Sequence, residues 1–419
     1  MCLARTVSVT GARSARVVLT LVVALLIQLD SVASDTVTIS KDDLDREFLL
    51  QTSYQQAGSR EDFNTSRSRV VIFEWGNQTL KMIEKHRGTG LPDRVLAYVP
   101  IRGETERAFV VDFNAGFDRV FTEEDRTGED YNGRSETEDY SAIPLAQRRL
   151  VNVTRDGPML VLEQRGLDED GGAVTVHHYL SPYRHNDDFE PFELANLDHF
   201  GFYETYPRRV SGRVVLYAMK FDSHAPIVFA LSAGIPPAYR EAVRDGVRYW
   251  NKALDKRLLR VIDAPEGVTA PSPEYNVIQW VPEGDRASTS HIQSDPLTGE
   301  ILHASIFLRA RMVNEGDFEE RGDRWRYIVA HEVGHALGLR HNLATGPTTT
   351  VMNYLPYKES IRIGHYVVES GADALEYDRK VVRYVYLREP LDLRSLPAFC
   401  TDHQERCDPF LALSRNSTP

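Results

Sequence analysis

The feature that most constrains this chain is the spacing of His331, His335, Gly338 and His341. His331 and His335 are four positions apart, so on a helix of 3.6 residues per turn both imidazoles lie on one face, one turn apart. Gly338 allows the chain to leave the helix, because glycine adopts left-handed backbone angles without steric cost. His341 can then turn back toward the first two histidines. The segment therefore predicts a helix followed by a sharp turn, with three imidazoles together.

Helix is expected here because apolar side chains recur at helical spacing along one side of the segment. They are Trp325, Ile328, Val329 and Leu337. Asp323 stands near the expected start of the helix, where an acidic residue is favourable.

Three neutral imidazoles that leave one position open for water are typical of a catalytic zinc site. A structural site would be closed by four ligands, usually cysteines, and the cysteines here are distant in sequence. We therefore predict that His331, His335 and His341 bind Zn²⁺. Glu332 projects about 100° around the helix from His331 and is placed to take a proton from the water. With Glu332 as general base, this arrangement predicts hydrolysis of peptide bonds.

The pattern His-Glu-x-x-His-x-x-Gly-x-x-His, followed by Met352, resembles the signature of the metzincin zinc metallopeptidases. The resemblance implies that Met352 lies in a turn that forms an apolar floor beneath the metal ligands. It also implies that Tyr354 reaches toward the zinc and stabilises the oxyanion, with a purely structural tyrosine as the alternative. The segment from Glu300 to Leu308 resembles the edge strand along which metzincins bind an extended substrate.

More of the chain is similar to poorly characterised bacterial secreted zinc metallopeptidases. The similar segments are the run from Pro226 through Tyr354 and Asp45 to Leu50 in the N-terminal part. Asn342 departs from several metzincin families, which carry Asp or Ser after the third histidine, and this leaves the subfamily open. Those relatives also run longer at the C-terminus.

The N-terminal part alternates short apolar runs with polar turns, which predicts strands. The runs include Val70–Phe73, Arg94–Val99, Pro158–Leu162 and Ala173–Val176. Asp168–Gly172 between the last two predicts a hairpin turn. We expect a β-rich antiparallel N-terminal domain over residues 34–220, with a solvated loop at 122–140.

From residue 221 to 392 strand and helix candidates alternate, as in α/β proteins. The expected strands are Pro226–Leu231, Arg257–Ile262, Asn276–Val281 and His303–Leu308. A helix with Trp250 and Leu254 on its apolar face follows the first strand. The resemblance implies an α/β (α+β) metzincin-like catalytic domain, a twisted mixed sheet with two long helices. Asp378 is expected near the start of the last helix, in a packing role, and residues 393–419 form a C-terminal tail.

The N-terminal sequence predicts a signal peptide of residues 1–33. Arg5, Arg13 and Arg16 precede the apolar run Val17–Leu29, and small residues before Ser34 suit cleavage. The run is shorter than a membrane span, which argues against an uncleaved anchor. We therefore expect a secreted protein, extracellular or periplasmic, with no stable membrane span in the mature chain.

The mature chain would retain two cysteines, Cys400 and Cys407. An exported pair this close can form a small disulfide loop or remain as two thiols. The N-terminal domain offers no cysteine to cap a metal. Whether that domain is a removable prosegment or a permanent partner is left open.

The charge balance narrows the possible partners. With 61 acidic against 49 basic residues, the chain lacks the basic excess that nucleic-acid binding needs. A protein or peptide substrate is the leading expectation. The alternatives are a catalytically silent zinc-binding module for recognition or adhesion, and a zinc hydrolase acting on other carbonyl compounds. The sequence does not decide the oligomeric state.

Overall fold

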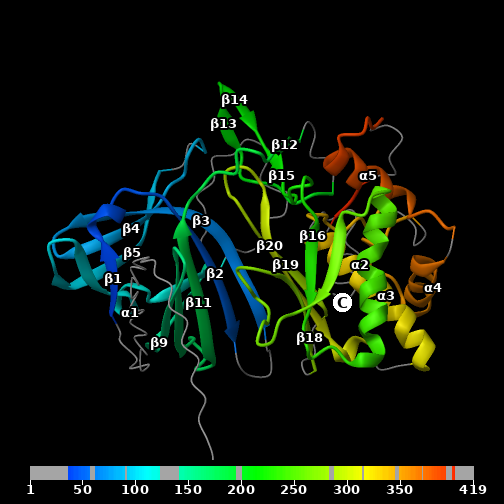
Figure 1. The fold of residues 1–419 in the computed structure, drawn as a ribbon, viewed down its shortest axis with the longest axis horizontal. Helices are drawn as coiled ribbons and strands as arrows, with labels where there is room; N and C mark the ends of the chain where they lie inside the picture. Colours follow the sequence, from blue (N-terminus) through cyan, green and yellow to red (C-terminus); the bar gives the residue numbers. More distant parts are fainter. Residues whose placement is uncertain are drawn as a thin grey trace, which may run out of the picture. The chain divides into compact units, whose positions relative to one another are not determined.

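The computed structural model describes residues 36–56, 62–89, 92–122, 141–194, 201–282, 287–313, 316–344, 349–369, 371–392 and 399–401. These residues belong to one compact unit, which begins at Ala33. Within it, two larger sheets are formed, an antiparallel sheet early in the chain and a mixed sheet later (Figure 1).

The N-terminal sheet has nine strands among the described residues, and each pairs with its neighbours antiparallel. In sheet order they are β1 (Thr36–Ser40), β6 (Ala108–Asp112), β5 (Arg94–Glu104), β4 (Thr79–Glu84), β3 (Asp62–Gly76), β2 (Phe48–Gln56), β11 (Ala173–Pro182), β10 (Met159–Leu167) and β9 (Ala146–Asp156). The predicted β-rich antiparallel region is confirmed.

Alternating apolar residues set the register of this sheet. In β10, Leu160 and Leu162 are buried while their neighbours are partly exposed, as the two-residue period of a strand requires. Asp168 closes the predicted hairpin turn by donating its N–H to the Gly172 carbonyl at 2.9 Å. Of the predicted loop at 122–140, residues 123–140 lie outside the described part of the chain.

The remaining short elements lie between strands of the N-terminal sheet or in the segment that connects the two sheets. They are η1 (Lys41–Asp43), α1 (Phe113–Gly116), β7 (Arg119–Thr122), β8 (Ser141–Pro144), β12 (Phe192–Glu193), β13 (Arg208–Val210), β14 (Arg213–Val215) and β15 (Tyr217–Ala218). Phe192, Phe202 and Ala218 from this connection belong to the same buried core as the later helices. The boundary predicted at residue 220 stays a prediction, and the core already includes residues before it.

The second sheet is mixed, as predicted. Its strands, in sheet order, are β17 (Leu259–Asp263), β16 (Ile227–Leu231), β18 (Asn276–Val281), β20 (Ile301–Arg309) and β19 (Thr289–Ser294). The first four run parallel, and β19 runs antiparallel to β20.

The strand assigned to the substrate edge from the sequence was wrong. The segment Glu300–Leu308 falls largely in β20, which lies between β18 and β19, so the edge strand on this side of the sheet is β19 and the other edge strand is β17. The physical reason lies in burial. Ile306 and Leu308 are fully buried, as in a central strand, whereas β19 is polar and half-exposed and carries little apolar signal.

Two long helices, α2 (Arg240–Leu254) and α3 (Phe318–Ala336), pack together against this sheet (Figure 1). The shorter helices of this half are η3 (Pro237–Tyr239), η4 (Ala310–Val313), α4 (Tyr357–Val368) and α5 (Glu376–Leu387). The α3 helix starts before the predicted Asp323, because Asp317 and Glu320 form a capping box that adds a polar first turn. Among the described residues, no helix is long and apolar enough to span a membrane.

Candidate metal centre

The α3 helix carries His331 and His335 on a buried face, at its C-terminal end. Gly334, between them, lets the helix approach its neighbours closely. A Cβ atom at Gly334 would overlap Met352 Sδ and lie 2.7 Å from the Trp250 ring. The position therefore requires glycine. The sequence did not reveal this requirement, because both packing partners are distant in the chain.

The chain turns sharply after α3. Gly338 has a φ of +96°, which confirms the predicted left-handed conformation. A Cβ atom there would overlap the carbonyl oxygen of Met219. The turn brings His341 beside His331 and His335, as the sequence predicted.

The three imidazoles converge through their Nε2 atoms. His341 Nε2 lies 3.1 Å from both His331 Nε2 and His335 Nε2, and the last two are 3.2 Å apart. A tetrahedral zinc ion with bonds of about 2.0–2.1 Å has ligand atoms roughly 3.3 Å apart. The triangle therefore matches one face of such a tetrahedron and leaves the fourth position for water or substrate.

Backbone carbonyls fix which nitrogens carry protons. His331 Nδ1 lies 2.7 Å from the Val351 carbonyl, and His335 Nδ1 lies 2.8 Å from the Leu339 carbonyl. A carbonyl only accepts, so each Nδ1 donates its proton and each Nε2 presents a lone pair. Burial and the neighbouring imidazoles lower the pKa of His335, which favours the neutral ring. Two lone pairs this close repel each other unless a cation lies between them, so these residues fit zinc.

Glu332 follows the first histidine on α3, and its side chain is buried. Burial raises the pKa of Glu332 to about 8. A divalent cation nearby acts in the opposite direction, because it favours the ionised carboxylate. Burial and a bound cation therefore act on the pKa of this carboxyl group in opposite directions.

Met352 lies in a buried turn that contacts α3 at Gly334. Its N–H donates to Thr350 Oγ1 at 2.9 Å, and its carbonyl accepts the Asn342 N–H at 2.7 Å. The turn is thus tied to the residue that follows His341. The floor role predicted for Met352 stays a prediction.

A buried carboxylate, Asp378 of α5, holds this turn. It accepts hydrogen bonds from Thr350 Oγ1, from the Val351 N–H at 2.9 Å and from Tyr249 Oη at 2.7 Å. Burial raises the pKa of Asp378 to about 6, against the effect of these three donors. Because the Val351 carbonyl accepts the proton of His331 Nδ1, Asp378 supports the first histidine through one residue. The sequence assigned it packing alone, although an acidic residue on an apolar helix face was a signal.

Tyr354 is half-exposed and lies over His341. Its hydroxyl is 3.2 Å from His341 Nδ1, and the ring centroids are 4.3 Å apart. Nδ1 is the ring nitrogen that does not face the other two imidazoles. The hydroxyl is therefore placed as the polar partner of His341, in the way that carbonyls serve the other two histidines.

The C-terminal tail contacts the segment after the third histidine. Asn342 is fully buried, and its Oδ1 accepts the Cys400 N–H at 3.3 Å, while the Cys400 carbonyl accepts the Leu343 N–H at 2.6 Å. Cys400 is disulfide-bonded. Its predicted partner, Cys407, lies outside the described residues.

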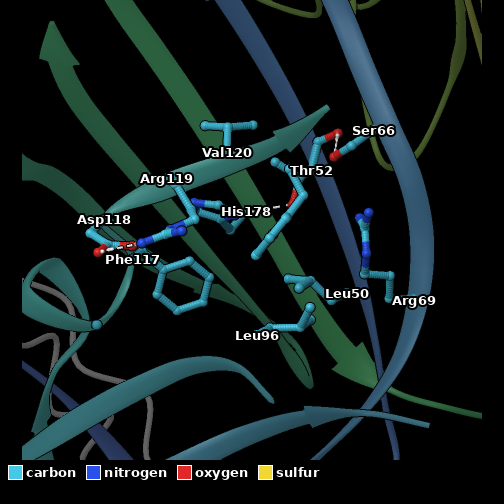
Figure 2. Close-up of a pocket in the computed structure, with 12 residues that line it drawn as sticks. Leu50, Thr52, Ser66, Arg69, Leu96, Phe117, Asp118, Arg119, Val120 and His178 are labelled. Carbon is cyan, nitrogen blue, oxygen red and sulfur yellow. Dashed lines mark hydrogen bonds and ion pairs between the residues drawn. The ribbon is translucent and has the colours of Figure 1, made fainter. Parts of the chain in front are cut away.

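A small cavity inside the N-terminal sheet offers no alternative site. Figure 2 shows Thr52 and His178 at this cavity, near Phe117. Its volume of about 20 Å³ is that of roughly one water molecule. Burial lowers the pKa of His178 to about 3, so the ring is neutral and bonds Thr52 at 3.1 Å. No peptide fits there.

The chain was compared with protein-family models, curated proteins and solved structures. Residues 315–386 match a family model described as Met-zincin. No curated protein sequence matches the chain. One solved structure that is similar is high choriolytic enzyme 1, a hatching enzyme zinc-protease of the medaka fish Oryzias latipes, at 13% identity and a TM-score of 0.24. That match covers 40% of this chain and 93% of the fish protein.

Proposed function

We propose that this chain, which is a zinc metallopeptidase of the metzincin type, is a secreted endopeptidase that cleaves proteins or peptides with Glu332 as general base. One observation carries the proposal. The three Nε2 atoms converge within 3.2 Å, and Glu332 lies buried on the same helix as two of them.

In the proposed reaction, His331, His335 and His341 hold the zinc ion as neutral donors. When bound, zinc supplies a Lewis acid that lowers the pKa of water and polarises a carbonyl group. The Glu332 carboxylate accepts a proton from the attacking water and later delivers it to the leaving nitrogen of the substrate. The carbonyls of Val351 and Leu339 keep two imidazoles in the tautomer that zinc requires.

The direct test is cleavage of unfolded casein by the mature protein, with and without a chelator. We expect cleavage that stops on chelation and returns when zinc is added. The Glu332→Gln variant should lose turnover by a factor of about 10² or more while it retains zinc, because glutamine cannot carry the proton. A variant that loses zinc instead would show that Glu332 has another role. A zinc-loaded protein that cleaves no peptide would favour the silent binding module.

Export is part of the proposal and rests on the sequence of residues 1–33. Positive charge, a short apolar run and small residues before Ser34 support a cleaved signal peptide. Expression in a secreting host should give extracellular or periplasmic protein whose N-terminus is Ser34, measured by mass spectrometry. Retention of the full chain in the membrane fraction would refute export by this route.

A further inference from the structure

A large cavity adjoins His335, between the two sheets of the molecule. Its volume is about 420 Å³, within the range of about 300–1,000 Å³ that ligand pockets occupy. We call it the β3–β19 cavity. The described residues that line it are Tyr54, Asn64, Thr65, Arg67, Ser68, Tyr203, Glu204, Thr205, Tyr206, Met219, Ser290, His291, Ile292, Ser294, His335 and Arg340.

Both sheets supply walls of this cavity. One wall comes from β2 and β3 of the N-terminal sheet, and the other comes from β19, the edge strand of the second sheet. β3 lies beside β19 (Figure 1). A substrate held at the three histidines therefore meets side chains of the N-terminal sheet next to His335.

The charges that line the β3–β19 cavity do not balance. Glu204 is the only carboxylate among the described lining residues, and it is buried against Arg340 at 2.9 Å. Burial lowers the pKa of His291 to about 4, so that ring is neutral. Arg67 adds a further positive charge, since arginine stays protonated in proteins. This charge also acts on the buried carboxylate of Glu84, which lies outside the residues that line the cavity.

Arg67 is held in place by stacking. Its guanidinium carbon lies 3.3 Å from the centroid of the Tyr206 ring, which also lines the cavity. Stacking covers one face of the guanidinium and leaves its N–H edge as the donor. A planar, oriented arginine edge in a cavity rich in hydroxyl groups suits a carboxylate, which accepts two parallel N–H bonds.

We infer that the β3–β19 cavity is a substrate subsite that binds a carboxylate group through Arg67. The inference rests on the proposed peptidase function and gives it a substrate class. The carboxylate can come from an aspartate or glutamate side chain of the substrate or from its terminal carboxylate. In either case a residue of the N-terminal sheet sets the specificity of a site whose metal ligands all lie on the second half of the chain.

The test uses the full mature, zinc-loaded protein and three peptides of equal length. One has a glutamate near the cleaved bond and an amidated C-terminus, one has glutamine there with the amide, and one has glutamine with a free C-terminus. We expect one of the two carboxylate peptides to be cleaved with a kcat/KM about tenfold above the neutral peptide. In Arg67→Ala this ratio should fall to about one. Arg67→Glu should cleave a fourth peptide, which has lysine in place of glutamate, faster than it cleaves the glutamate peptide.

Arg149→Ala is the matched control, since Arg149 is an exposed arginine of the same sheet that does not line the cavity, and it should keep the wild-type ratio. Arg67→Lys should retain part of the preference, which a merely structural arginine would not explain. If Arg67→Ala cleaves all three peptides with the wild-type ratio, the subsite inference is overturned. If the wild-type protein cleaves no peptide at all, the proposed function fails instead, so the two failures are distinct.

Discussion

At the scale of single residues, Gly334 decides how closely α3 approaches the metal-site turn. Gly334→Ala places a methyl group on Met352 Sδ and against the Trp250 ring. We expect a loss of about 1–3 kcal/mol in the free energy of unfolding, measured by urea titration, because overpacking forces the neighbours to shift.

Gly322 provides the control on the same helix. The nearest atom to a Cβ at Gly322 is Arg326 Nη1 at 4.0 Å. Gly322→Ala should therefore stabilise the protein by about 0.5–1 kcal/mol, through the better helix propensity of alanine. Equal effects of the two substitutions would contradict the packing role of Gly334.

Tyr354 gives a second test at a single residue. Its hydroxyl faces Nδ1 of His341, so Tyr354→Phe removes a polar partner of the third histidine. We expect zinc affinity to fall about tenfold, measured by competition with a coloured chelator. Tyr98→Phe, at an exposed tyrosine of β5, should leave zinc affinity unchanged. A lower kcat with unchanged zinc affinity would instead support the oxyanion role predicted from the resemblance.

The grouping of His331, His335 and His341 around Gly338 was predictable because all four residues lie within eleven consecutive positions. Helix periodicity and glycine conformation are local properties, and local properties can be read from sequence. Asp378 was not recognised in the same way, since its three donors lie on α2 and on the turn before Met352. Such contacts depend on how elements pack, which spacing alone does not specify.

At the scale of elements, Asp378 couples α5 to the metal-site turn and makes stability depend on pH. Its pKa is raised from 3.8 to about 6 in the folded protein. The stability contribution of Asp378 is therefore fully present below about pH 4 and is lost as the pH rises through 6, a change of about 3 kcal/mol.

The comparison of the metal-free protein with metal-free Asp378→Asn isolates this group. Wild-type stability should fall relative to the variant between pH 4 and pH 6, measured by urea titration at half-unit steps. If the difference in unfolding free energy between wild type and variant stays constant from pH 4 to pH 6, the raised pKa is contradicted. Zinc affinity of the variant should also fall. The amide N–H₂ group of asparagine is itself a donor, so it cannot accept the hydrogen bonds that the carboxylate accepts from Tyr249 and Val351.

Strand assignments show the limit of sequence prediction at this scale. The hairpin at Asp168–Gly172 and the strands β16 and β18 were predicted because apolar runs and turn residues mark them. The edge strand β19 was missed because it is polar, and the resemblance placed the substrate edge on the more apolar segment that forms β20. Whether a strand lies at the edge of a sheet depends on how many neighbouring strands it pairs with. The sequence of the strand itself does not show this number.

At the scale of the whole molecule, the N-terminal sheet contacts β19 through β3, and the segment that follows the sheet is hydrogen-bonded to the second half of the chain at several places. Tyr183 Oη donates to Asp295 at 2.9 Å, and Asn186 Nδ2 donates to Glu300 at 2.8 Å. Further on, the Arg340 N–H donates to the Gly201 carbonyl at 2.6 Å. These contacts join residues more than a hundred positions apart, so the sequence left the prosegment question open.

The contacts predict that the N-terminal sheet is a permanent part of the active enzyme. Removal of the chain up to residue 220 would take Phe202 and Ala218 out of the core that supports α3, and would open one wall of the β3–β19 cavity. We expect the active protein, recovered after casein cleavage, to begin near Ser34 by mass spectrometry. A chain that begins at Phe221 should be insoluble or inactive. Activity that appears only after proteolysis near residue 190–220 would instead identify the sheet as a removable prosegment.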